Sequence, residues 1–513
     1  MRKFQARQGS VVQAYKFALD PTCAQLRSLA SHAGAARVAY NWALATVKAN
    51  WDQRAAETSY GIAEEDLTPW VDWSLPGLRR AWNQAKRADP RYGWWAANSK
   101  ESYNTGPGNL NAALSNWQAS RNGTRKGPKA GFPRFKSKRR ATPAVRFTTG
   151  AIRVEPDRKH VTLPVLGTIT IRTHESTRKL QRRLADGRAR VLSATVRFER
   201  GRWFAAFQVE VERDHRPPAR PHVAAGVDLG ITHLAVIADT DGGVWYEPNP
   251  RHLDHALKDL AQANRRLSRR VGPAGRDPAT GSKVRRVPSR RWEKAKARLA
   301  QVHTRVANLR ADGLHQLTTA LTREYGVLVL EDLNVAGMVR NHRLARHISD
   351  ASFGEFRRQV SYKAGWNGGT LLLAERWFAS SKTCSDCGAV KTKLALKVRV
   401  FDCDVCPLVL DRDENAARNL AALAAEYLAQ ACSAGTAVGG SLTETPVTDR
   451  VSVNARGAGR KTRRYHPDRA TGRGGRAGGV NPRKRKETST APSSTRKTAC
   501  NGRSTDSESM RNQ

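Results

Sequence analysis

Cysteine is scarce in this chain, with only seven residues among 513. So few cysteines in so long a chain exclude a disulfide-stapled secreted scaffold and fit a reducing compartment. Long apolar runs are also missing, because no stretch approaches the roughly 20 residues that a membrane-spanning helix needs. The start, Met1-Arg2-Lys3-Phe4, is not followed by the apolar core of a signal peptide. We therefore expect a protein that resides in the cytoplasm and has no membrane partner.

Acidic residues are few relative to basic ones: 45 Asp and Glu face 89 Lys and Arg, a formal net charge of +44. Such an excess predicts a polyanionic partner, most simply DNA or RNA. A basic tail does not explain it, because residues 433–513 carry 17 basic and 6 acidic residues and leave +33 to the rest. Residues 121–140 hold nine basic residues and no acidic one, interrupted by Gly and Pro, which predicts a basic loop.

The length allows two to four domains, and no internal repeat is evident. The first half predicts a strand at 11–19, a turn and cap at Asp20-Pro21-Thr22, a helix at about 23–50, further helices in the Trp-rich stretch 51–120, strands of a small barrel at 141–213 and a linker at 216–221. The second half predicts strands at 223–229, 234–238, 244–246 and 327–330, and helices at about 251–270, 290–323 and 414–431. Beyond about 435, Gly, Ser, Thr, Pro and Arg predict a disordered tail.

Three acidic residues share a context that suggests catalysis. Asp228 lies in or at the end of an apolar strand, Glu331 ends another apolar strand, and Asp413 stands at the start of a helix. Carboxylates clustered in this way are typical of RNase H-like nucleases, in which they bind two Mg2+ ions about 3.5–4 Å apart. Each also has an ordinary interpretation as a turn residue, a surface acid or a helix cap. Asp411 competes with Asp413 for the third position, and Asp332 competes with Glu331.

Four of the cysteines form two pairs, Cys384 with Cys387 and Cys403 with Cys406, in the spacing C-x2-C-x15-C-x2-C. This spacing is typical of a zinc ribbon that holds one structural Zn2+. Buried apolar cysteines or a redox pair would not explain two such units 15 residues apart. Pro407 stands where many ribbons have Gly, but the four thiolates that would bind the metal remain.

Several motifs together resemble the TnpB family encoded by bacterial insertion sequences, which is related to type V CRISPR nucleases. The resemblance covers about residues 10 to 430. The motifs are Gly34-Ala35-Ala36-Arg37-Val38-Ala39-Tyr40-Asn41-Trp42, Gly131-Phe132-Pro133-Arg134-Phe135-Lys136, Gly226-Val227-Asp228-Leu229-Gly230, Leu330-Glu331-Asp332-Leu333-Asn334-Val335, Ser380-Ser381-Lys382-Thr383-Cys384 and Asp411-Arg412-Asp413-Glu414-Asn415-Ala416-Ala417-Arg418-Asn419-Leu420.

The resemblance implies a multidomain fold of mixed α+β and α/β class. It implies a wedge β-barrel in residues 1–220 with a helical recognition insert at about 23–125, a RuvC-like nuclease domain in 221–432 with a zinc ribbon at 380–408, and a basic tail in 433–513. It further implies that Asp228, Glu331 and Asp413 are the catalytic, Mg2+-binding triad. The expected activity is cleavage of double-stranded DNA that matches a bound guide RNA from the transposon end, beside a short target-adjacent motif. Such a protein would associate with the bacterial nucleoid.

Three other functions stay open at this stage. A transposase would use the same carboxylates on element ends without a guide RNA. A repressor would bind DNA through a guide but lack cleavage, which the presence of all three acids disfavours. A zinc-ribbon RNA-binding protein would leave Asp228 and Glu331 unexplained. The residues Trp82, Trp94, Trp95 and Trp117 could stack on bases, although packing within the helices is the favoured interpretation.

Overall fold

The computed structural model describes residues 6–433 and 450–451, apart from 126, 139, 173–175, 214–215, 272–274, 277–280, 282 and 285–287. Most of the expected tail therefore lies outside the described residues. The exception is Arg450–Val451, which forms the short strand β17 where we expected disorder. Within the described ranges, no helix is long and apolar enough to cross a membrane.

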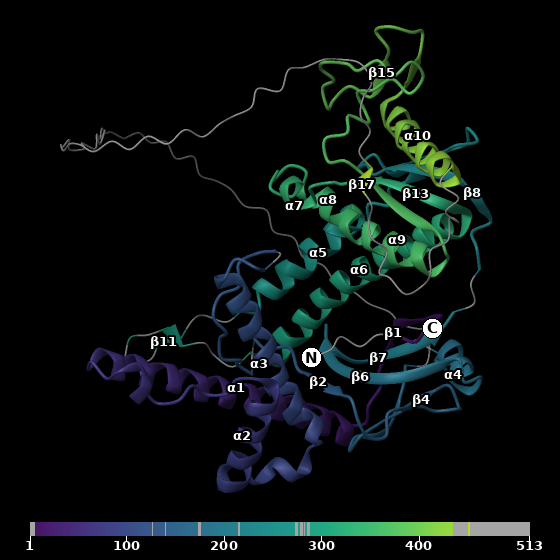
Figure 1. Cartoon of the computed structure of the whole chain (residues 1–513). Coiled ribbons are helices and arrows are strands. Elements are labelled where there is room, and N and C mark those ends of the chain that lie inside the picture. The colour runs from purple at the N-terminus through teal and green to yellow at the C-terminus, as the bar shows by residue number, and fades with distance from the viewer. Residues whose placement is uncertain are drawn as a thin grey trace, which may run out of the picture. The chain divides into compact units, whose positions relative to one another are not determined.

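The first strand and helix form where the sequence predicts them (Figure 1). Strand β1 spans Ser10–Ala18, and helix α1 spans Cys23–Ser59, longer than expected. A capping box starts α1: the Thr22 hydroxyl accepts a hydrogen bond from the Gln25 backbone N–H, and the Gln25 side chain accepts one from the Thr22 backbone N–H.

The Trp-rich stretch is helical, as predicted. It contains η1 (Glu64–Asp66), α2 (Leu75–Ala88), η2 (Pro90–Ala97) and α3 (Lys100–Arg121). Trp82 is buried, Trp95 packs against its cluster, and Trp117 lies 5.3 Å from Trp51 between ring centroids. These three side chains therefore serve packing, whereas Trp94 is 40% exposed.

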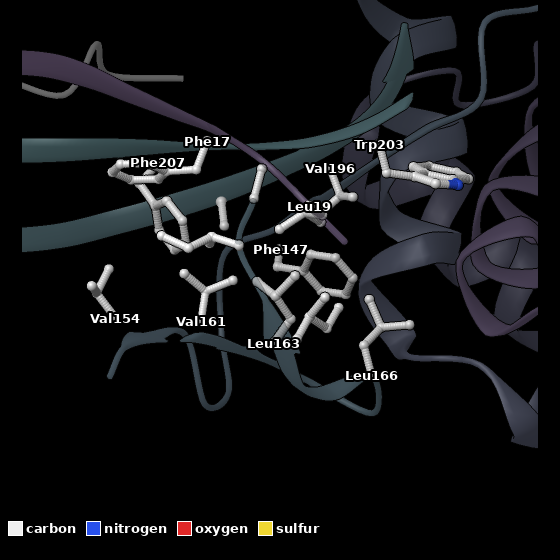
Figure 2. Packing of buried hydrophobic residues seen from close by; sticks show 14 of the residues in the cluster. Phe17, Leu19, Phe147, Val154, Val161, Leu163, Leu166, Val196, Trp203 and Phe207 are labelled. Atoms are coloured by element: carbon white, nitrogen blue, oxygen red, sulfur yellow. The ribbon is translucent and has the colours of Figure 1, made fainter. Parts of the chain in front are cut away.

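Strand β1 and the strands after the basic loop form two small sheets rather than a closed barrel. One sheet has the antiparallel order β1-β7-β6-β2, and the other has the order β3-β4-β5. The strands are β2 (Ala144–Phe147), β3 (Arg153–Val154), β4 (His160–Leu163), β5 (Gly167–Thr170), β6 (Ala189–Glu199) and β7 (Arg202–Glu212), with helix α4 (Arg178–Ala185) before β6. Figure 2 shows the shared core, in which Phe17, Phe147 and Phe207 face the residues of β4.

The prediction of a closed barrel is therefore wrong. The described link between the two sheets is one bridge, between Leu19 and Ile171. Strands β2 to β5 are only two to four residues long. Such short strands provide too few hydrogen bonds to continue a ladder around a barrel.

A six-stranded sheet with the order β10-β9-β8-β13-β14-β17 organises the second half. Its strands are β8 (Arg220–Asp228), β9 (His233–Asp239), β10 (Val244–Pro248), β13 (Tyr325–Glu331), β14 (Thr370–Ala374) and β17. Strands β8, β13, β14 and β17 are parallel, whereas β9 and β10 are antiparallel to their neighbours. Because β8 already starts at Arg220, the predicted linker is shorter than expected.

Helices cover both faces of this sheet. The helices are α5 (His252–Ser268), α6 (Arg290–Glu324), α7 (Val335–Met338), α8 (Ala345–Ala351), α9 (Phe353–Trp366) and α10 (Arg412–Ser433). Residues of α6, α8 and α9 pack on one face, and Leu420 and Leu423 of α10 pack on the other. The sequence predicted α5, α6 and α10 but missed α7 to α9 and β14. Short strand pairs occur at β11 (Gly275–Arg276) with β12 (Lys283–Val284) and at β15 (Val400–Asp402) with β16 (Val409–Asp411).

Candidate active site and zinc site

The three predicted carboxylates lie near one another at one edge of the six-stranded sheet, where their charges interact. Asp228 is the last residue of β8, and Glu331 is the last residue of the neighbouring parallel strand β13. Asp413 is the second residue of α10, which packs across β8 and β13 (Figure 1). Carboxyl ends of adjacent parallel strands lie at the same edge of a sheet. Residues almost 200 positions apart in the sequence are thereby brought into one cluster.

Gly226 sets the distance between α10 and the sheet. A Cβ atom at this position would lie 2.2 Å from the backbone oxygen of Ala417 and 2.3 Å from the backbone nitrogen of Ala421. Only a residue without a side chain allows the helix to approach β8 this closely. Since Asp228 lies two residues beyond Gly226, this contact also holds the start of α10 near the carboxylate of Asp228.

The cluster carries an excess of negative charge. Burial raises the pKa of Asp228 well above its ordinary value, and the neighbouring carboxylates of Glu331 and Asp413 raise it further. Burial also raises the pKa of Glu331, opposed by a hydrogen bond from the Ser380 hydroxyl and by the charge of Arg412. A site that disfavours its own ionised carboxylates favours the binding of protons or cations.

The two competing acids already have structural partners. The carboxylate of Asp411 accepts hydrogen bonds from the backbone N–H groups of Asp413 at 2.8 Å and Glu414 at 3.2 Å, so it caps the start of α10. Asp332 is buried between two arginines, with oxygens 2.6 Å from Arg357 Nη1 and 2.8 Å from Arg376 Nη2. These contacts account for both residues without a catalytic role.

The sequence did not indicate two polar side chains at the edge of the cluster, Arg399 and Thr232. Arg399 Nη1 lies 3.3 Å from Asp413 Oδ1, and its Nη2 donates a hydrogen bond of 2.8 Å to Thr232 Oγ1. Arg399 precedes β15 and lies 14 residues before Asp413 and 167 residues after Thr232, so no local pattern could have indicated that it contacts both. A guanidinium beside the carboxylates is suited to bidentate contact with a phosphate.

The four predicted cysteines also converge. Their Sγ atoms all lie within 4.8 Å of one another, with 3.6 Å between Cys384 and Cys406 and 3.6 Å between Cys387 and Cys403. Four zinc–sulfur bonds of about 2.3 Å in tetrahedral geometry place sulfurs about 3.8 Å apart. The arrangement is therefore consistent with a structural zinc ion.

Local backbone geometry supports each cysteine pair. Gly388, with a φ of 74°, follows the first pair in the left-handed region. The second pair closes without a glycine, since the Cys403 backbone N–H donates to the Leu408 oxygen at 2.9 Å, on the far side of Pro407. Hydrogen bonds to Cys403 Sγ from the backbone N–H groups of Cys406 and Val405 lower the pKa of this thiol to about 6. At Cys403 this favours the thiolate, the form that binds metal, whereas the pKa values of Cys387 and Cys406 are raised.

Helix α10 holds the cysteine unit next to the carboxylates. The side chain of Asn415, which is fully buried, accepts a hydrogen bond from the Ser385 N–H at 2.9 Å and donates one to the Thr383 oxygen at 2.7 Å. Arg412 donates to the backbone oxygen of Ala395 at 3.0 Å and to Ser381 Oγ at 3.1 Å. The segment from Asp411 to Asn415 therefore joins three roles within five residues: a helix cap, a candidate catalytic acid and anchors for the cysteine unit.

Three family models match the chain. Residues 206–342 match OrfB_IS605, described as "Probable transposase". Residues 353–420 match the model described as "Cas12f1-like, TNB domain", which spans the four cysteines. Residues 11–55 match a model described as "Helix-turn-helix domain", which the sequence motifs did not indicate.

Several relatives share most of their length with this chain. A protein of Mycobacterium tuberculosis, provisionally named an RNA-guided DNA endonuclease, is 41% identical over 434 residues, covering 82% of this chain and 88% of the relative. One from Streptomyces pristinaespiralis with the same provisional name is 32% identical over 428 residues, covering 83% and 92%. A similar solved structure is that of Cas12f1 with sgRNA and target DNA, at 13% identity and a TM-score of 0.40, covering 81% of this chain and 99% of that one. The identity with the bacterial relatives and the span that they share show that the chain belongs to the TnpB (OrfB_IS605) family.

Proposed function

We propose that this protein is an RNA-guided DNA endonuclease that hydrolyses target DNA matched to a bound guide RNA, beside a short target-adjacent motif. The observation that carries the proposal is the cluster of Asp228, Glu331 and Asp413, assembled from two strands and a helix at one sheet edge. The names of the bacterial relatives support the RNA-guided part. The net charge of +44 supports two nucleic-acid partners, because contact with a single duplex would need less positive charge.

Asp228, Glu331 and Asp413 would hold two Mg2+ ions. The fit rests on the raised pKa values of Asp228 and Glu331, since burial together with like charge disfavours both anions until cations neutralise them. When bound, such ions polarise the phosphate and lower the pKa of the attacking water. The protein's own groups then orient the site: the Ser380 hydroxyl fixes Glu331, and Asp411 fixes the first turn of α10 beneath Asp413. Arg399 supplies a guanidinium for the negative charge of the phosphate.

One Zn2+ would be held by Cys384, Cys387, Cys403 and Cys406, with a structural role. The ion would fix the unit that carries Arg399 and that Asn415 and Arg412 anchor to α10. Binding would supply folding energy to a segment that has little hydrophobic core of its own. The zinc site would thereby stabilise the position of the start of α10.

The domain organisation follows from the same proposal. Residues 1–220 would form a wedge domain of two open sheets with a helical recognition insert at 23–125. Residues 221–432 would form the RuvC-like nuclease domain, of RNase H-like class, with the zinc ribbon at 380–408. Residues 433–513 would form a basic tail that adds non-specific affinity for nucleic acid.

A transposase acting on insertion-sequence ends is the second candidate, favoured by the description of the family model that matches residues 206–342. The two functions differ in whether RNA is required. Protein purified with its RNA should cut a plasmid that carries the matched target and flanking motif when Mg2+ is present. Cutting should stop when the RNA is digested and return with added guide. Equal cutting of element ends without RNA would support the transposase and contradict the proposal.

A further inference from the structure

Trp377 is the large apolar side chain with the highest exposure in the part of the chain that the structure describes, at 89%. An indole offers a large apolar area that proteins usually bury. A single exposed apolar residue is ordinary by itself. What distinguishes Trp377 is its place and the rigidity of the segment that presents it.

The segment that carries Trp377 leaves the sheet at the edge that holds the carboxylates. Ala374, the last residue of β14, pairs with Glu331 of the parallel strand β13. Because parallel strands end at the same edge, the residues after Ala374 begin beside Glu331. Trp377 follows three residues later.

Contacts on both sides of Trp377 tie this segment to the site. Arg376 Nη2 lies 2.8 Å from Asp332 Oδ2, and the Ser380 hydroxyl donates a hydrogen bond to Glu331. Between them, the Phe378 backbone N–H donates to the Glu375 oxygen at 2.9 Å, and the Phe378 ring packs with the cluster below α10. The backbone of Trp377 is thus fixed on both sides, while its ring faces water.

We propose that Trp377 is a stacking platform for a nucleobase of the single DNA strand that enters the carboxylate site. The proposal rests on the proposed nuclease function. Aromatic rings stack on any base, so such a contact positions a strand without reading its sequence. Arg376, the neighbour of Trp377 in the chain, and Arg399, which lies beside Asp413, carry positive charges that suit the phosphates of that strand. A rigid ring loses little conformational entropy on binding. The stacked base would also cover the apolar face of the indole, which is now exposed to water.

The first test measures stacking without cleavage. Full-length protein with its RNA, in buffer without Mg2+, is mixed with a short single-stranded DNA that contains 2-aminopurine, whose fluorescence falls on stacking. We expect quenching with the wild-type protein, less with Trp377→Phe and none with Trp377→Ala, together with affinity weaker by about 5- to 150-fold for Trp377→Ala. Leu396→Ala is the matched control, because Leu396 is 80% exposed in the cysteine unit but has no ring; it should behave as wild type. Equal quenching by Trp377→Ala would overturn the proposal.

The second test uses cleavage. An abasic nucleotide is moved along the target strand of a matched substrate, and the rate of cutting by the wild-type complex should fall most at one position. Trp377→Ala should cut more slowly on intact DNA and lose the extra sensitivity at that position. Cutting by Trp377→Ala that keeps the wild-type rate and abasic profile would contradict stacking but leave the nuclease proposal intact. Quenching that depends on Trp377, in a protein that never cuts under RNA guidance, would contradict the nuclease proposal alone.

Discussion

Gly226 of β8 lies directly under the backbone oxygen of Ala417, so that strand and helix touch backbone to backbone. This contact brings the start of α10 to the carboxyl end of β8. The position of Asp413 beside Asp228 therefore depends on a residue that itself has no functional group.

Replacing Gly226 by Ala should separate α10 from the sheet. Overpacking of this kind costs about 1–3 kcal/mol of stability, and we expect at least that loss together with a strong decrease in cutting. Thermal unfolding and single-turnover cleavage would measure the two effects. Gly354→Ala is the control, because a Cβ there meets no atom within 4 Å; a Gly226→Ala protein as stable and active as this control would refute the explanation.

Substitution of any of the three carboxylates should reduce cutting more than substitution of Ser380, whose hydroxyl donates a hydrogen bond to Glu331. Asp228→Asn, Glu331→Gln and Asp413→Asn should each reduce cutting to background while target binding persists, because each removes a proposed metal ligand but no proposed phosphate contact. Ser380→Ala should cost about 10- to 100-fold, as is typical of a group that orients a ligand. The measurement is the single-turnover cleavage rate beside target binding by filter retention. A Ser380→Ala protein less active than Glu331→Gln would show that we have misassigned the two.

Asp411 should behave as a helix cap. Asp411→Ala should reduce the free energy of unfolding by about 0.5–2 kcal/mol and reduce cutting only mildly, whereas Asp411→Asn, which can still accept the N–H bonds of Asp413 and Glu414, should be close to wild type in both. Denaturant unfolding and cleavage rates give the comparison. Loss of cutting in Asp411→Ala with activity retained in Asp413→Ala would reverse the assignment of the third acid.

The raised pKa values predict a pH-dependent stability of the metal-free protein. A carboxyl whose pKa is higher when folded than when unfolded, where it is about 4, contributes stability that decreases as pH rises from about 4 through the folded value. Asp228→Asn cannot ionise, so it should melt at a higher temperature than wild type in buffer without Mg2+ at pH 7–8. This difference should shrink as pH falls towards about 4. Mg2+ should raise the melting temperature of wild type and have little effect on the variant; an Asp228→Asn protein less stable than wild type at pH 8 would contradict the electrostatic explanation.

Metal binding and anchoring of the cysteine unit should be separable. Cys403→Ser should lose zinc, measured by elemental analysis of fresh protein, and lower both stability and cutting. Asn415→Ala should keep zinc but leave the Ser385 N–H without its partner, at a cost of about 1–3 kcal/mol, whereas the Thr383 oxygen still accepts from Asn419. Zinc-free wild-type protein would refute the zinc proposal, and full activity of Asn415→Ala would refute the anchoring role.

Local chemistry made several features predictable from the sequence alone. Thr22 and Gln25 form a capping box because their types and spacing suffice, and the apolar run before Glu331 forms a buried strand for the same reason. The cysteine spacing likewise predicted four sulfurs around one point, since two tight turns bring each pair together. Helix α9 and strand β14 were not predicted from the sequence. The predicted barrel closure was wrong because closure depends on strand length and on pairing between distant segments.

The sequence by itself determined the types of side chain available: three acids in strand-end and helix-start contexts, four cysteines in ribbon spacing, and an excess of basic charge. Only the tertiary structure decided how they meet. In the folded protein Asp411 caps helix α10, and Asp332 pairs with two arginines. Arg399 contacts Asp413, and Trp377 is exposed three residues after the strand that pairs with Glu331. These choices depend on contacts between residues far apart in the chain, because parallel pairing of β8, β13 and β14 and the close approach at Gly226 fix which side chains share an edge.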